Sequence, residues 1–422
     1  MERYTEEKLN KMSVHTLRVI LRSEFNGVPG VSNKGELISQ ILDIQSGASA
    51  PARSTKGRKP LGEFITPISE ELTFSDAESD EDTIKRGVFE QNADGYGFVR
   101  VNKGLGFVDY FVPKTIAKKY SLSTGDEIEC SVYYASEVGA LNVKSILAVN
   151  GKLPQEGDKK EDFSLLRAKY PSEKISFTKG NSPIVDAVDL FCPIGKGQRC
   201  LVEDVDGKFG TSFANRILNN VNDENITILS LFAGVKPEEV EDAFQNKNRQ
   251  NVVLPITFSA EETLRIVNLT VERAKTLCQM GKDVLLVLDS LSYIANVYGE
   301  YSASEKSSGY VKLGLTPSKF VNEIFGVGGN FGEGKSITVI ATVDAKREDR
   351  SLGELVSIAT SVVKLEGNDI ISRRGYVVDL LNSYTIKDEM LLTKEQICYV
   401  DGEREKLNEN KGYLAKIYSD LK

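Results

Sequence analysis

The chain has 422 residues, 40% of them hydrophobic, which is enough for roughly two or three domains with their own cores. Its formal net charge of -8 is unlike that of proteins that bind nucleic acid through bulk positive charge, so any such binding must depend on local patches. No apolar run approaches the ~20 residues that cross a bilayer, and the charged opening has no signal-peptide apolar region, so we expect no membrane association and a cytoplasmic location.

The residues that usually hold metals or disulfides are few and scattered. The only histidine, His15, lies in an N-terminal helical pattern, which excludes a histidine-based triad or metal site. No C-x-x-C pair occurs, so we expect reduced, mostly buried thiols and no bound metal at the five cysteines, Cys130, Cys192, Cys200, Cys278 and Cys398.

The N-terminal part divides into a helical segment and a charged one. Apolar residues recur at helical spacing on both sides of a Gly-Pro turn, which predicts a helix-loop-helix module over residues 1–47. Residues 48–83 are rich in Ser, Gly, Pro and charge, and we interpret them as a flexible linker.

Residues 84–151 contain several short alternating segments separated by turn residues, a pattern typical of a small closed barrel. The motif G-Y-G-F-V-R at residues 95–100 places Tyr96 and Phe98 on one face of a strand, because side chains at i and i+2 point the same way. Two interpretations stay open for these rings: a stacking platform for single-stranded bases, or part of the barrel core.

Residues 163–400 alternate apolar strand-like runs with amphipathic helical patterns, which predicts a parallel sheet covered on both faces. Residues 401–422 remain as a C-terminal tail. The overall prediction is an α/β multidomain protein.

One loop of this region resembles a phosphate-binding loop in position but not in chemistry. Such loops read G-x-x-x-x-G-K-[ST], because glycine backbone holds phosphates, Lys reaches the β/γ-phosphates and Ser/Thr binds magnesium. Here the segment from Glu203 to Ser212 reads E-D-V-D-G-K-F-G-T-S. Thr211 keeps the hydroxyl, but Gly210 precedes it, and Lys208 lies two positions before Gly210. We therefore treat Gly207, Lys208, Gly210 and Thr211 as a vestigial nucleotide site.

Asp289 follows the apolar run Val284–Leu288 and adds one more residue to this vestigial site. It suits a magnesium-associated aspartate at a strand end, or an aspartate that only caps a strand-to-helix turn, and the sequence leaves both open.

Several motifs in the same order resemble the bacterial Rho transcription termination factor family. They are D-G-Y-G-F-V-R, V-D-Y-F-V and L-S-T-G-D in residues 94–126, then L-F-C-P-I-G-K-G-Q-R, K-P-E-E-V, D-V-L-L-V-L-D-S, S-I-T-V-I-A-T and L-L-T downstream. The resemblance covers nearly the whole chain. It implies an N-terminal helical module, an OB/cold-shock-like RNA-binding barrel and a RecA-like parallel-sheet domain of P-loop type.

The resemblance also implies where RNA would bind. On the barrel it implies Tyr96, Phe98, Arg100, Asp109, Phe111 and Glu137, with Gly139 where the family has a second pocket aromatic. In the central-channel loop after Asp344, which is shortened, it implies Lys346, Arg347 and Arg350.

The resemblance shows where family ATPase residues are replaced. Val235 stands at the position of the catalytic glutamate, and valine cannot polarise an attacking water. The segment Leu381–Thr385, where the arginine finger is expected, contains no arginine, although Arg373 and Arg374 lie upstream. We therefore expect no catalytic residues, and ATP and Mg²⁺ as cofactors only if the altered loop still binds them.

Three functions follow as hypotheses. The first is an RNA-binding, ATPase-deficient relative that forms rings or hexamers, alone or with an authentic Rho, and modulates termination, with RNA polymerase as a further candidate partner. The second is a working ATP-dependent translocase that uses Lys208 through a rearranged loop. The third is a passive scaffold whose N-terminal module and linker bind nucleic acid or protein.

Overall fold

The computed structural model describes Leu9, Leu17 and residues 34–46, 83–102, 107–135, 140–155, 162–241, 250–304, 314–332, 334–345, 350–368 and 375–421. In the predicted helical module, helix α3 spans Lys34–Ser46, and its Leu37, Ile38 and Ile41 are buried. Apart from Leu9 and Leu17, the rest of that module, with His15, and the predicted linker up to residue 82 lie outside the described residues.

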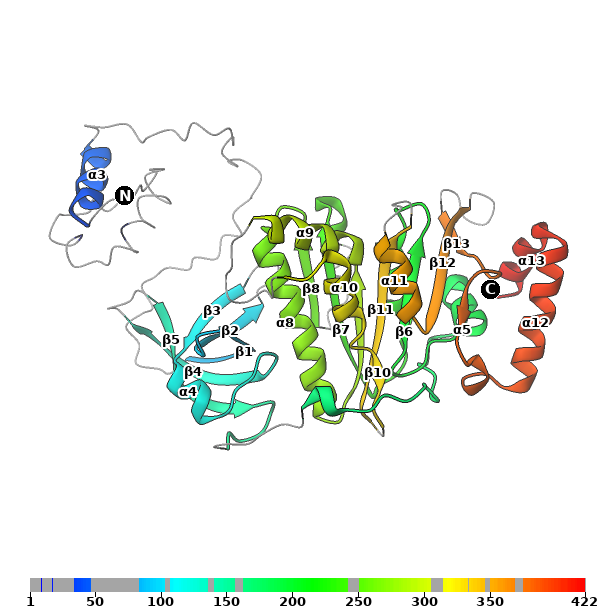
Figure 1. Ribbon diagram of the computed structural model, residues 1–422, viewed down its shortest axis with the longest axis horizontal. Helices are drawn as coiled ribbons and strands as arrows, with labels where there is room; N and C mark the ends of the chain where they lie inside the picture. Colours follow the sequence, from blue (N-terminus) through cyan, green and yellow to red (C-terminus); the bar gives the residue numbers. More distant parts are fainter. Residues whose placement is uncertain are drawn as a thin grey trace. The chain divides into compact units, whose positions relative to one another are not determined.

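A closed five-stranded barrel follows, with the strand order β1-β2-β3-β5-β4 (Figure 1). Side chains alternate between the interior and the exterior, so Phe89 and Val99 are fully buried inside while Phe98 points outward and is partly exposed. Its strands are β1 (Thr83–Gln91), β2 (Gly97–Asn102), β3 (Phe107–Val112), β4 (Glu127–Ala135) and β5 (Ala140–Val149), with helix α4 (Lys114–Lys119) between β3 and β4.

The remaining described strands form one mixed sheet of nine strands (Figure 1). Its central strands, in the order β12-β6-β11-β9-β7-β8, are parallel, and β13, β14 and β10 pair antiparallel. The strands are β6 (Arg199–Asp204), β7 (Ile226–Val235), β8 (Gln250–Pro255), β9 (Asp283–Asp289), β10 (Gly329–Asn330), β11 (Ser336–Asp344), β12 (Ser361–Asn368), β13 (Gly375–Val378) and β14 (Tyr384–Thr385).

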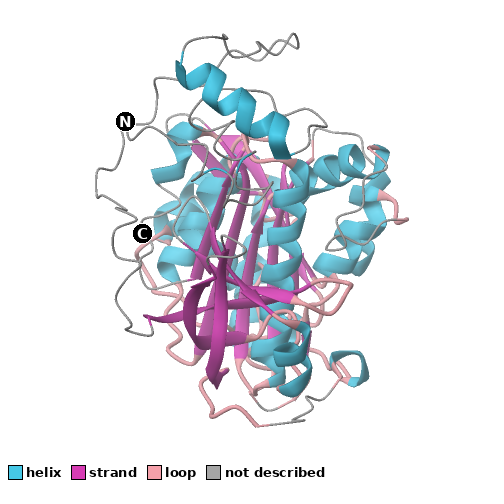
Figure 2. Cartoon of the chain, turned by 90° about the vertical axis from the view of Figure 1, so that its left-hand side faces the viewer, coloured by secondary structure: helices cyan, strands magenta, loops and turns pink. Residues whose placement is uncertain are grey.

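Helices cover both faces of this sheet, as Figure 2 shows. The alternation along β9 explains why both faces are apolar: Val284, Leu286 and Leu288 belong to one core, whereas Leu285 and Val287 belong to the other. The first face carries α8 (Ala260–Gln279), α9 (Leu291–Ala303), α10 (Pro317–Phe325) and α11 (Arg350–Ile358); the second carries α5 (Pro183–Phe191), α6 (Gly210–Asn220), α12 (Lys394–Glu409) and α13 (Leu414–Asp420).

Local sequence signals set where these helices begin. Ser259 and Glu262 form a capping box at the start of α8, in which each side chain binds the other residue's backbone N–H. Thr393 and Gln396 do the same for α12. Short 3₁₀ turns occur at Phe163–Leu165, Pro237–Glu239, Asp388–Met390 and Lys411–Tyr413.

The C-terminal helices are part of the second core. Helix α12 runs through the expected boundary at residue 400, and the tail residues Leu407, Ile417 and Tyr418 are buried. The backbone N–H of Val378 on β13 donates to the Tyr418 hydroxyl at 2.9 Å. The Arg404 guanidinium donates to three backbone carbonyls, those of Leu380, Phe191 and Ser383. The last described residues therefore complete the edge of the sheet.

Four of the five cysteines are buried and all five are free thiols, with Cys398 exposed. Burial raises the pKa of Cys200 and Cys278 to about 12, which keeps these thiols protonated and unreactive near neutral pH.

Within the described residues, no group of three or more His, Cys, Asp or Glu side chains is placed to hold a metal ion. No described helix is both long and apolar enough to cross a membrane.

Candidate functional site

The outer face of the barrel carries a cluster of three aromatic rings. Strands β2 and β3 pair so that Phe98 lies directly opposite Phe111. The ring centroids of Tyr96, Phe98 and Phe111 are 5.6 to 6.0 Å apart, within contact range of one another. All three side chains are partly exposed. The rings therefore form one continuous apolar surface, which we call the aromatic cluster.

Arg100, by contrast, is buried beneath this surface. Only 4% of its side chain is exposed, and its guanidinium pairs with the buried Glu90 at 2.6 Å and with Asp109. It also lies 4.6 Å from the centroid of the Phe98 ring, in cation–π geometry. The two carboxylates already satisfy Arg100, which therefore supports the ring of Phe98 and the side chain of Asp109 from below.

Charge and burial oppose each other in this group. Burial raises the pKa of the Glu90 carboxyl, although Arg100 and Arg265 act in the other direction. Burial lowers the pKa of Arg100, but its bonds to Asp109 and Glu90 outweigh burial and raise the pKa above its ordinary value. The guanidinium thus stays charged and its charge is balanced within the protein.

The second candidate region lies where parallel strands end. The register pairs Asp344 with Asp204 and Phe232 with Asp289, so the carboxyl ends of β11, β6, β7 and β9 meet at one edge. Ligands in open α/β sheets bind at this edge. Between β6 and α6 runs the loop of residues 205–209, which we call the β6–α6 loop.

The carboxylate of Asp204 binds this loop from inside. One of its oxygens, Oδ1, accepts hydrogen bonds from the backbone N–H groups of Asp206 at 3.1 Å and Gly207 at 2.9 Å. The other, Oδ2, accepts from the N–H groups of Phe209 at 2.5 Å and Gly210 at 2.8 Å. Asp204 is 3% exposed. A single buried carboxylate thus occupies four N–H donors at the start of helix α6.

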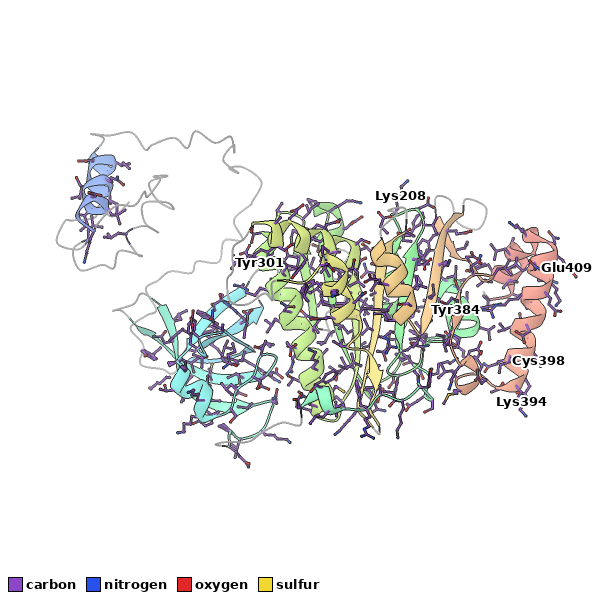
Figure 3. All side chains as sticks on the ribbon, viewed as in Figure 1. Lys208, Tyr301, Tyr384, Lys394, Cys398 and Glu409 are labelled. Atoms are coloured by element: carbon purple, nitrogen blue, oxygen red, sulfur yellow. The ribbon has the colours of Figure 1, made fainter. Side chains whose placement is uncertain are left out.

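The side chains around the loop are also engaged. The ring of Phe209 stacks on Tyr376 of β13, with centroids 5.1 Å apart and an angle of 30°. Gly207 has φ +64°, and a Cβ there would meet the Asp344 carboxylate at 2.8 Å, so only glycine suits this position. Lys208 is exposed, and Figure 3 shows its side chain pointing away from the sheet.

Thr211 and Asp289 lie together at the start of α6 and the end of β9. The Thr211 hydroxyl donates to Asp289 Oδ2 at 2.6 Å, and the Thr342 hydroxyl donates to Asp289 Oδ1. Burial raises the pKa of the Asp289 carboxyl, and the two hydroxyl groups oppose that shift. Of the residues assigned to the vestigial site, Gly210, Thr211 and Asp289 lie together, since a Cβ at Gly210 would meet Asp289 Oδ1 at 3.2 Å, whereas Gly207 lies against Asp344 and the Lys208 side chain is exposed.

Val235 stands where the resemblance implies the catalytic glutamate, and its side chain is buried. Val235 ends β7 and is 3% exposed, packed into the second core. In the segment Leu381–Thr385, a turn at Leu381 and Asn382, whose N–H groups donate to the Asp379 carboxylate at 3.1 Å, precedes the short strand β14. Of the other sequence candidates, Glu137, Lys346 and Arg347 lie outside the described residues, and for Arg350 only its backbone, at the start of α11, is described.

Two features of the site escape the sequence prediction. Glu90 is the buried partner of Arg100, and nothing in its strand pattern distinguishes it from a solvated residue. Asp204 is an acceptor for its own loop; its place before an Asp-Gly turn is the signal that could have found it, because aspartate often binds backbone N–H groups that follow it.

Residues 185–374 match the nucleotide-binding domain of the ATP synthase alpha/beta family. The transcription termination factor Rho of Karelsulcia muelleri is 27% identical over 317 residues, which cover 71% of this chain and 83% of that protein. The Rho protein of Borreliella burgdorferi is 27% identical over 337 residues, 76% of this chain but 64% of that protein.

Among solved structures, an ATPase from the type III secretion system of pathogenic bacteria is 19% identical to this chain. It covers 62% of this chain and 77% of its own, with a TM-score of 0.48. The matched nucleotide-binding domain contains the parallel sheet, and the barrel precedes it, so the predicted fold class is confirmed for the described residues.

Proposed function

Since this chain is a divergent member of the Rho transcription termination factor family, we propose that it binds single-stranded RNA through its barrel and acts in termination without hydrolysing ATP. Its relatives carry the name of transcription termination factors, and this chain spans 64% to 83% of the length of the two described above. RNA binding by this chain, its assembly into rings and its binding to any partner protein are therefore proposed here.

The aromatic cluster supports the RNA-binding part. Three partly exposed rings in contact offer faces on which successive bases can stack, and such stacking contributes about 1–3 kcal/mol per base. Stacking needs little positive charge, which suits a chain of net charge -8. Asp109, 36% exposed at its side chain, adds an acceptor at the edge of the cluster for base amino groups.

The bonds of Asp204 carry the proposal that ATP is not hydrolysed. A triphosphate at this edge needs the N–H groups of the β6–α6 loop and of the first residue of α6, and the Asp204 carboxylate already holds four of them. A phosphate brought to the same place would also meet that negative charge in a buried setting. The residues do not fit a triphosphate with Mg²⁺, and we derive no catalytic step through them.

Two further positions also argue against ATP hydrolysis. Gly210 stands where Lys would reach the β/γ-phosphates, and the buried Val235 has no group that could orient a water. With Leu381–Thr385 free of arginine, three of the groups that such an ATPase uses in phosphoryl transfer are replaced, while Thr211 and Asp289 are kept.

The first test measures RNA binding and ATP hydrolysis by the full chain on the same preparation. We expect binding to pyrimidine-rich single-stranded RNA and no ATP turnover with or without that RNA, with an authentic Rho as the positive control. RNA-stimulated turnover by this chain would contradict the proposal and favour a working translocase. Full loss of RNA binding on deleting residues 1–82 would instead favour the helical module and linker as the binding part.

The second test addresses the role in termination. We propose that the chain joins rings, alone or with an authentic Rho. Because each ATP site of such a ring is built by two subunits, one inactive member weakens two sites. Adding this chain to authentic Rho in a purified termination assay should lower termination in proportion to its share. Unchanged termination at every ratio would contradict mixed rings.

A further inference from the structure

We propose that Asp204 acts as an internal ligand of the β6–α6 loop. Its carboxylate takes the place that a bound oxyanion would have and holds the loop in the conformation that such an anion would stabilise. This inference deepens the proposed function and rests on it in one respect, that no nucleotide uses this loop.

The hydrogen bonds show how complete the occupation is. Each Asp204 oxygen accepts two backbone N–H groups, at distances between 2.5 and 3.1 Å. An isolated carboxylate with this burial would be strongly penalised, so these donors are what allow Asp204 to remain 3% exposed. The carboxylate and the loop therefore stabilise each other.

Side-chain packing holds the same conformation independently. Phe209 stacks on Tyr376, which is itself 5% exposed, and the Arg216 guanidinium lies 5.5 Å from the centroid of the Tyr376 ring. Tyr376 belongs to β13, so Phe209 anchors the loop to the sheet, and Arg216 of α6 contacts the same tyrosine ring. Removing the Asp204 carboxylate alone leaves this packing in place.

A loop held in this way should keep its donors oriented after Asp204 is shortened. The substitution Asp204→Ala removes the carboxylate that four N–H groups share at the start of an eleven-residue helix, and of these the Gly207 N–H keeps the Asp204 backbone carbonyl as an acceptor at 3.2 Å. Converging N–H groups at a helix N-terminus bind phosphate-type oxyanions. We therefore expect Asp204→Ala to unfold at a lower temperature and to regain stability when an oxyanion enters the space.

The experiment follows thermal unfolding of the full chain against pyrophosphate at constant ionic strength. The wild type should show no shift with pyrophosphate. Asp204→Ala should lose several degrees in Tm and recover them progressively as pyrophosphate rises, because a ligand that binds only the folded state stabilises it by mass action. Sodium sulfate at the same ionic strength tests a smaller oxyanion, and sodium chloride tests ionic strength alone.

Two variants separate this effect from a general loss of stability. Asp204→Asn removes the charge but still fills the space, so its Tm should fall without recovery in pyrophosphate. Asp379→Ala removes another carboxylate that accepts backbone N–H groups, in the turn at Leu381 and Asn382. Its Tm should be equally indifferent to pyrophosphate.

The Tm of each variant with and without pyrophosphate decides between the outcomes. Recovery in Asp204→Ala but not in the two controls supports an internal ligand. A pyrophosphate shift in the wild type, no shift in Asp204→Ala, or equal shifts in all variants would overturn it. If Asp204→Ala does not fold in chloride, Asp204→Ser is refolded with and without pyrophosphate: folding only with pyrophosphate supports the inference, and failure in both counts against it.

The same data keep this inference apart from the proposed function. Absent recovery in Asp204→Ala would remove the internal ligand but leave an RNA-binding protein that does not hydrolyse ATP. RNA-stimulated ATP turnover by the wild type would remove the proposed function, whatever the variants show. Failure to bind RNA would remove the role of the barrel and leave the behaviour of the β6–α6 loop unchanged.

Discussion

The aromatic cluster of the barrel and the β6–α6 loop contain the residue types expected for recognition, but they differ in what already contacts those residues. On the barrel, the charged Arg100 is satisfied internally while the rings of Tyr96, Phe98 and Phe111 stay partly exposed. In the loop, the backbone donors themselves are satisfied, by Asp204. A recognition group is available to a ligand only when the protein has not already supplied its partner.

The largest loss of stability should come from breaking the buried ion pair between Arg100 and Glu90 in the barrel. Arg100→Met leaves the buried Glu90 with the more distant Arg265, at 3.7 Å, as its remaining cation, and breaking a buried ion pair costs up to about 3–5 kcal/mol of unfolding free energy. Urea unfolding measures the loss. The matched control is Arg86→Met, since Arg86 pairs with Glu127 but is 67% exposed, and an exposed pair contributes about 0–1 kcal/mol. Equal losses in both variants would contradict the supporting role of Arg100.

The next effect concerns the exposed rings. Phe98→Ala and Phe111→Ala should each weaken binding of pyrimidine-rich single-stranded RNA by about 5- to 150-fold, which corresponds to the ~1–3 kcal/mol of one stacked base. Fluorescence anisotropy with labelled RNA measures this. Tyr133→Ala serves as the control, because Tyr133 is an exposed aromatic of β4 outside the aromatic cluster. A larger loss in Tyr133→Ala than in Phe98→Ala would move the RNA site elsewhere.

A smaller, pH-dependent effect is expected at Asp289. Burial raises the pKa of this carboxyl above its ordinary value of 3.8, so the folded state holds its proton to higher pH than the unfolded state. Its contribution to stability therefore falls as pH rises from 3.8 through the raised pKa, and is constant above it. Asp289→Asn should remove that slope, so the wild type minus variant difference in unfolding free energy should decline with pH. A difference that rises with pH would contradict the shift.

The smallest effect is predicted for Lys208. Its side chain is exposed and points away from the sheet, so Lys208→Ala should change unfolding free energy by less than about 0.5 kcal/mol and leave RNA affinity unchanged. The same variant discriminates the translocase hypothesis. If the wild type hydrolyses ATP and Lys208→Ala does not, the β6–α6 loop must rearrange around Lys208 when nucleotide binds.

The fold could be predicted because its signals are local and repeated. Alternation in residues 84–151 predicts a barrel, and the fully apolar run Val284–Leu288 predicts a strand covered on both sides. The expected boundary at residue 400 differs from the structure because α12, capped at Thr393, continues to Glu409. A helix that packs along one core gives no break in composition at its middle.

The site could be predicted only in part, for a physical reason. The residue types at Gly210 and Val235 can be read directly, since a glycine cannot act as a lysine nor a valine as a base. The stacking of Phe209 on Tyr376 depends on two segments far apart in sequence. The bonds of Asp204 depend on the loop turning back through Gly207 at positive φ. Contacts of this kind exist only once the sheet has brought the segments together.

The bond between Tyr418 and Val378 also bears on how the chain folds during synthesis. The edge strand β13 is made some forty residues before Tyr418, yet its Val378 N–H finds its partner only in that tyrosine, and α5 packs in the same core as α13. While the ribosome still holds residues 414–420, the Val378 N–H and the part of α5 that contacts α13 lack these partners. Nascent chains should therefore resist proteolysis across the inner strands well before they resist it at β13, because domains protect a segment only when its packing partners have emerged.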